Sequence, residues 1–120
     1  MPLEVDMDSI LNTIKHMLGP SEGYEYFDTD IIININNAFS RLTQLGVGPV
    51  DGFRISDDSS VWEDFVTDQR LEAVKEYVYL KVRLGFDPPA NSAHISLMKE
   101  QIAELEWELN VVAETPCFNE

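Results

Sequence analysis

Six apolar residues near the end of the chain recur at alternating intervals of three and four. They are Ile95, Met98, Ile102, Leu105, Leu109 and Val112. In an α-helix this spacing places all six on one seam, which must be buried against another helix. Polar residues, including Lys99 and Glu106, fill the opposite side. The stretch therefore predicts a long amphipathic helix over residues 92–113, with Ile102 and Leu105 in the core.

Three earlier segments, 7–18, 29–45 and 68–84, also have helical periodicity, and Gly19, Gly46 and Gly85 are expected to end them. The run from Ile31 to Ile35 is β-branched and would also suit a strand. Apolar residues nevertheless recur every three or four positions up to Leu45, which favours a helix. Asp28 is the expected cap of this second helix, and Asn91 or Ser92 that of the fourth. The segment 68–84 is apolar around most of its circumference, so it should be central or shared with a partner.

These segments predict an all-α fold, a small four-helix bundle in one domain over residues 1–114, with a disordered tail at 115–120. A long irregular or hairpin loop should join the second and third helices. Residues 50–55 could form a short strand in it, and residues 61–65 a second strand or a helical turn. Loops of about twenty residues in so small a domain are often functional.

Aromatic residues in this loop, and one on the fourth helix, are candidates for an interface with a neighbouring protein. For the two tryptophans, a place in the core is at least as good an interpretation. The candidates are Phe53, Trp62, Phe65 and Trp107.

The charge of the chain limits its partners. It has 8 basic and 22 acidic residues among 120, for a formal net charge of −14. Nucleic acids and anionic membranes attract basic surfaces, so we expect neither specific nucleic-acid binding nor membrane binding. The charge permits plain solubility, a basic partner, or a surface that DNA passes without sticking. Glu100, Glu104 and Glu108 lie at i, i+4 and i+8, so they form one carboxylate stripe that either lines a channel or faces solvent.

The chain has little that suggests catalysis, and we expect no enzyme activity, no cofactor and no metal. His16 and His94 lie on different helices without the paired spacing of zinc ligands. No serine or cysteine has a base placed beside it by the sequence. Cys117 is the only cysteine, which excludes an intramolecular disulfide and fits a reducing compartment. The acidic N-terminus is unlike a signal peptide, so we expect a soluble protein in the cytoplasm where it is made.

Several segments together carry a family resemblance over about residues 8–114. They are residues 28–36 (DTDIIININ), 44–49 (QLGVGP), 74–89 (VKEYVYLKVRLGFDPP) and 104–110 (ELEWELN). In these segments the chain resembles the head–tail connector proteins, also called adaptor or head-completion proteins, of tailed bacteriophages and prophages.

The resemblance implies a small helical bundle with an extended loop, whose copies form a ring, commonly about twelve. Such a ring lies below the portal in the virion neck after assembly in the host cytoplasm. It extends the channel for DNA passage and docks the tail, so its partners are further copies, the portal protein and head-completion or tail proteins. A negative channel surface would repel phosphates.

An acidic decoy is the alternative function. Such a protein imitates DNA and binds a basic host nucleic-acid-binding protein. A connector should form rings, whereas a decoy should be a monomer or dimer that captures a basic protein.

Overall fold

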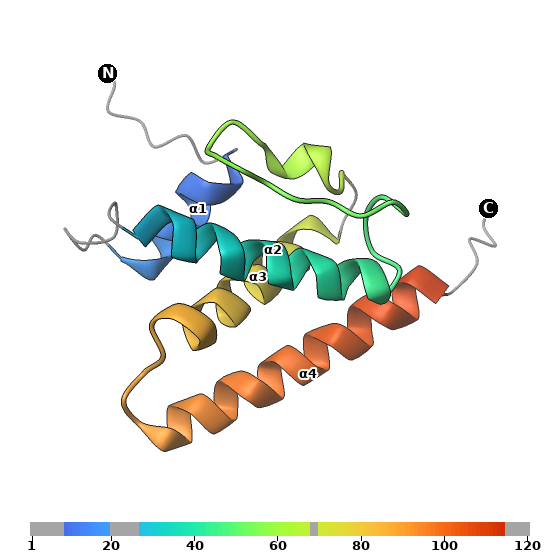
Figure 1. The fold of residues 1–120 in the computed structure, drawn as a ribbon. Coiled ribbons are helices and arrows are strands. Elements are labelled where there is room, and N and C mark those ends of the chain that lie inside the picture. The colour runs from blue at the N-terminus through green and yellow to red at the C-terminus, as the bar shows by residue number, and fades with distance from the viewer. Residues whose placement is uncertain (1–8, 20–26, 68–69, 115–120) are drawn as a thin grey trace.

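The structure is a computed structural model, and it describes residues 9–19, 27–67 and 70–114. These residues form four α-helices and no strand, so the expected all-α fold is confirmed (Figure 1). The helices are α1 (Ile10–Leu18), α2 (Asp28–Gln44), α3 (Leu71–Phe86) and α4 (Ser92–Glu114). A single turn of 3-10 helix, Trp62–Asp64, interrupts the connection between α2 and α3. The expected helix starts at 7 and 68 and the tail at 115–120 lie outside the described residues.

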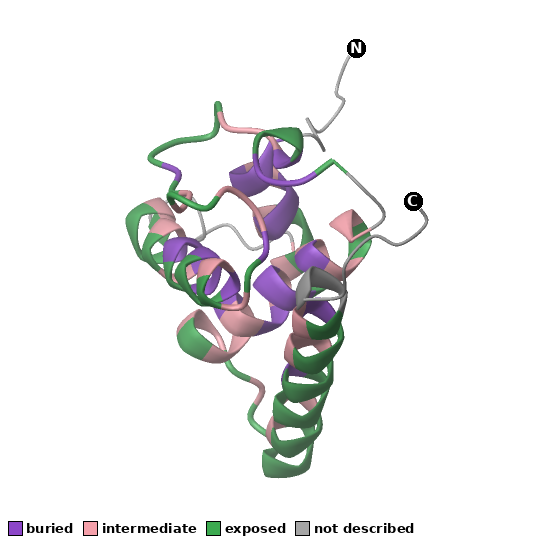
Figure 2. Cartoon of the chain, turned by 90° about the vertical axis from the view of Figure 1, so that its right-hand side faces the viewer, coloured by how far each residue is buried: buried purple, intermediate pink, exposed green. Residues whose placement is uncertain are grey.

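The α3 helix is the centre of the fold, as its nearly continuous apolar surface predicts. It packs against α1, α2 and α4. Val74, Tyr77, Val78 and Val82 are completely buried. Figure 1 shows α4 crossing beneath α2 and α3, and Figure 2 shows that much of α4 is open to solvent.

Two helix ends differ in how glycine is used. After α2, the Gly46 N–H donates to the carbonyl of Thr43 and the Val47 N–H to that of Leu42, with Gly46 at φ +88°. This is the hydrogen-bond pattern of a Schellman cap. Gly85, by contrast, does not end α3, which continues to Phe86. A Cβ atom at Gly85 would collide with the side chain of Asn34 unless that side chain shifted.

The N-terminal caps also differ from one helix to the next. Asn91 Oδ1 accepts hydrogen bonds from the backbone N–H groups of Ala93 (2.7 Å) and His94 (3.3 Å), so Asn91 caps α4 as one of the two expected residues. Asp28 does not cap α2. It is the first residue of that helix, and its carboxylate pairs with Lys15 of α1 at 2.8 Å. An acidic residue in this first turn is still favourable to the helix dipole.

The heptad seam of α4 is only partly covered within the chain. Ile102 and Leu109 are buried, 8% and 2% exposed. Leu105, expected in the core, is half-buried because it lines a groove between α1, α3 and α4. Ile95 and Met98 are also half-buried. Between Ile95 and Leu109 the seam thus retains apolar surface that the described residues do not cover.

Candidate interaction surfaces

The connection between α2 and α3 is folded onto the core through its aromatic residues. Phe39 of α2 is their centre, with ring centroids 5.1 Å from Phe53, 4.6 Å from Phe65 and 6.2 Å from Trp62. Trp62 is 1% exposed and Phe65 is 4% exposed. The Trp62 indole N–H donates to Thr13 Oγ1 of α1 at 3.1 Å.

The expected interface role of Trp62 and Phe65 is therefore corrected, because the core of the chain already contains both side chains. Phe53 is half-buried against the same cluster.

A buried asparagine fixes the path of this connection. The Ile55 backbone N–H donates to Asn36 Oδ1 at 2.8 Å, and Asn36 Nδ2 donates to the Ile55 carbonyl at 3.0 Å. The Asn36 amide thus satisfies the backbone hydrogen-bonding groups of Ile55. Residues 50–55 form no strand, contrary to the expectation from the sequence. The sequence signal was the position of Asn36 on the buried face of α2, between Ile35 and Phe39.

The outward side of the same connection is acidic. We call its exposed carboxylates the acidic edge: Asp57, Asp58, Glu63 and Asp64. Hydrogen bonds from the Ser59 hydroxyl (2.6 Å) and backbone N–H (2.9 Å) lower the pKa of Asp57. That carboxylate therefore remains ionised well into the acid range.

Tyr77, Arg41 and Glu106 link α4 to α3 and α2. The Tyr77 hydroxyl donates to Glu106 Oε2 at 2.7 Å, and an Arg41 guanidinium N–H donates to Oε1 at 3.4 Å. Burial, and then the hydrogen bond to Glu106, raise the pKa of Tyr77. Partial burial would raise the pKa of Glu106, but the hydrogen bonds from Tyr77 and Arg41 and the nearby positive charges outweigh it and lower that pKa. The group is a structural contact that links three helices, and no local sequence pattern predicts it.

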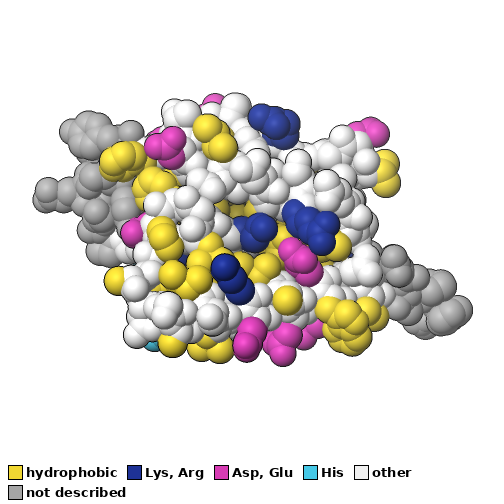
Figure 3. Space-filling model, turned by 60° about the horizontal axis from the view of Figure 1, so that its bottom comes forward, with side chains coloured by type: hydrophobic (Ala, Val, Ile, Leu, Met, Phe, Trp, Pro, Cys, Tyr) yellow, Lys and Arg dark blue, Asp and Glu magenta, His cyan; other side chains and the backbone are white. Residues whose placement is uncertain are grey.

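A hollow of about 410 Å³ lies beside this contact, between α2, α3 and α4. Asn34 and Asn37 of α2, Lys81 of α3, and Lys99 and Ile102 of α4 line it, and we call it the lysine cleft. Figure 3 shows basic side chains gathered over this part of the surface. On a chain with only 8 basic residues, such a concentration is unexpected.

The outer face of α4 carries both apolar and acidic side chains. Trp107 is 68% exposed, so unlike Trp62 it is available to a partner. Leu97 and Val111 are exposed on the same helix. The carboxylate stripe of Glu100, Glu104 and Glu108 is exposed throughout.

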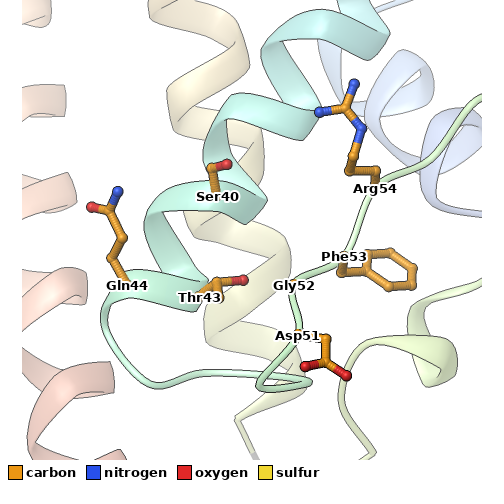
Figure 4. Close-up of a pocket in the computed structure, with 7 residues that line it drawn as sticks. All are labelled: Ser40, Thr43, Gln44, Asp51, Gly52, Phe53 and Arg54. Carbon is orange, nitrogen blue, oxygen red and sulfur yellow. The ribbon is translucent and has the colours of Figure 1, made fainter.

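Two further hollows offer no convergent chemistry. A groove of about 820 Å³ between α1, α3 and α4 is lined by apolar residues that include Leu80 and Leu105, and by charged residues that include Glu72, Lys75 and Glu108. A second hollow, of about 520 Å³, lies between α2 and the connection (Figure 4). There the Arg54 guanidinium and the Asp51 carboxylate lie at opposite ends and do not face one another.

Two negative findings apply to the described part of the chain. Within residues 9–19, 27–67 and 70–114, no three histidine, cysteine, aspartate or glutamate side chains gather in a way that could hold a metal ion. None of the four helices, over the residues described, is long and apolar enough to cross a membrane.

Comparison with known proteins supplies the family. A family model described as phage connector protein matches residues 10–116, and the chain therefore belongs to this family. The resemblance seen in the sequence is thereby confirmed. Searches of curated proteins and of solved structures found no match. Membership indicates a connector-type structural role in a phage particle and contact with other virion proteins.

Proposed function

We propose that this phage connector protein forms a ring in the neck of a tailed-phage particle, where it extends the portal channel and docks the tail. Its role there is structural, without catalysis, and it joins the particle from the host cytoplasm. The observation that carries the proposal is the uncovered surface of α4. Trp107 is 68% exposed on its outer face, and the heptad seam on its inner side is only partly covered, so both sides offer interaction surface in a chain of a connector family.

The carboxylate stripe on α4 supports a channel surface. Like charges at i, i+4 destabilise a helix by about 0.2–0.5 kcal/mol per pair. Glu100, Glu104 and Glu108 therefore do not stabilise their own helix. Lining a channel gives them a function, because a negative wall repels DNA phosphates and lets the genome pass.

Deletion of the gene from a phage that encodes this chain tests the role in the neck. We expect normal heads and normal tails that fail to join, or heads that lose their DNA, by electron microscopy of the lysate. Plasmid-borne wild-type chain should restore infectious particles, and mass spectrometry should find it in purified necks. A deletion phage with a normal yield of infectious particles would refute the proposal. Capture of a basic host nucleic-acid-binding protein by a monomeric chain would favour the decoy.

The channel assignment has its own test in the triple variant Glu100→Lys, Glu104→Lys and Glu108→Lys. If the stripe faces DNA, the variant should enter particles and slow genome release, because lysines retain phosphates that glutamates repel. The matched control changes the same three glutamates to Gln. It removes the repulsion of phosphates without adding attraction, so a comparison of the two triple variants separates these effects. Wild-type DNA release by particles shown to contain the Lys variant would place the stripe outside the channel and leave the neck role intact.

A further inference from the structure

The lysine cleft is basic surface on an acidic protein. Lys81 and Lys99 come from two helices far apart in the sequence and line one hollow with Asn34, Asn37 and Ile102. Arg41 is the third basic residue of this region. It pairs with Glu106, whose carboxylate also lies near Lys81. Figure 3 shows basic side chains close together on one face of the molecule, with an acidic side chain beside them.

The two basic residues of the cleft, Lys81 and Lys99, form no ion pair with a carboxylate of the described residues. Lys15, Arg41 and Lys75 each form an ion pair within the described residues, at 2.8, 3.4 and 3.9 Å. Over those same residues Lys81 and Lys99 form none, although 22 acidic residues are available in the chain. The carboxylate of Glu106, which lies near Lys81, already accepts from Tyr77 and Arg41. The Lys81 ammonium is instead 6.0 Å from the centroid of the Tyr77 ring.

We propose that the lysine cleft of one copy binds the acidic edge of the α2–α3 connection of a second copy. The edge supplies four exposed carboxylates, and Asn36 and the aromatic cluster hold the connection that carries them. The cleft supplies two unpaired ammonium groups and two side-chain amides that can donate to carboxylate oxygens. The proposal rests on the proposed function, for which it names a contact between neighbouring copies.

The two surfaces lie on different sides of the chain. Figure 1 places the connection at the top and α4 at the bottom, and the side view of Figure 2 agrees. One copy therefore cannot bring its own edge into its own cleft. A contact that joins unlike surfaces of successive copies is head-to-tail, and such contacts generate rings when the rotation closes.

Ionic strength decides where this attraction can be measured. At net charge −14 two copies repel each other at long range. Near 0.15 M salt the Debye length is about 8 Å, which screens most of that repulsion but leaves pairs in close contact. At about 1 M it falls to about 3 Å, and the pairs weaken as well. Self-association should thus be strongest at intermediate salt.

Charge reversal in both surfaces provides the test, read by sedimentation equilibrium near 0.15 M salt. Lys81→Glu with Lys99→Glu reverses the cleft, and separately Asp57→Lys, Asp58→Lys and Glu63→Lys together reverse the edge, because only Asp64 of its four carboxylates then remains. Each set should weaken self-association about tenfold or more. A one-to-one mixture of the two proteins should recover it, because each reversed cleft then meets a reversed edge. Lys99→Glu and Arg54→Glu both change the net charge from −14 to −16, but only the first should weaken association. Circular dichroism confirms that each variant is folded.

Three results would overturn the proposal. They are a wild-type chain that stays monomeric at millimolar concentration, equal effects of Lys99→Glu and Arg54→Glu, and a mixture that associates no better than its components. All are solution measurements, so they are independent of the neck assay. If the protein is present in necks but charge reversal does not change its self-association, this contact is rejected and the neck role stands. If charge reversal acts as expected but the protein is dispensable for joining heads to tails, the neck role is rejected and the contact stands.

Discussion

Replacing Asn36 by alanine should release the α2–α3 connection from the core. The side chain is 7% exposed and makes two hydrogen bonds to the backbone of Ile55, at 2.8 and 3.0 Å. Alanine leaves the Ile55 N–H and carbonyl without these partners. Ile55 is itself 4% exposed, so water reaches the two groups only if the connection moves.

The expected cost follows from these two bonds. A typical hydrogen bond contributes about 0.5–1.5 kcal/mol net, and a buried group left unsatisfied costs about 1–3 kcal/mol. We therefore expect Asn36→Ala to lower the free energy of unfolding by about 2–4 kcal/mol, part of which local opening of the connection can relieve. Domains of this size are stable by about 5–15 kcal/mol, so the variant should still fold.

Urea unfolding followed by circular dichroism measures this loss, and trypsin measures the local release, since Arg54 precedes Ile55 in the connection. Asn37→Ala is the matched control. Asn37 is exposed on the same helix, and its side chain has no hydrogen bond in the described part of the chain, so its removal should change stability by less than about 0.5 kcal/mol. Equal stabilities and equal cleavage after Arg54 in the two variants would refute the assignment of Asn36 as the clamp.

Two further predictions concern α4. Leu109→Ala should lower the free energy of unfolding by about 2–5 kcal/mol, because Leu109 is 2% exposed. Leu105→Ala should lower it clearly less, because the Leu105 side chain borders an open groove. Urea unfolding of the two variants measures the difference, and equal losses of stability would contradict the prediction. The pKa of Glu106 lies below its ordinary value of 4.5 in the folded chain, so its contribution is present above about pH 4.5 and is lost as pH falls through the folded pKa. Glu106→Gln should therefore be less stable than wild type at pH 7 and lose less stability on acidification; identical acid-unfolding profiles would exclude the contribution.

The helices could be predicted from the sequence because their periodic apolar residues satisfy a local rule. The path of the connection could not, since no period governs it. Gly48 illustrates this. It has φ +85°, and a Cβ atom there would collide with the ring of Phe65, which lies far along the connection. Glycine lets the backbone approach the aromatic ring closely, but only the fold brings these two residues together.

The surfaces could be predicted less well than the core, because charge is counted along the chain but acts in space. A net charge of −14 suggests a uniformly acidic exterior, yet packing brings Lys81 of α3 and Lys99 of α4 to one hollow against α2. That meeting depends on which side of α3 receives α4, which is settled by Ile102, Leu109 and the Tyr77–Glu106 contact. Total charge alone therefore does not support a role in DNA passage. The support comes from the carboxylate stripe, whose glutamates repeat every four residues on one side of α4, are exposed, and repel one another within their own helix.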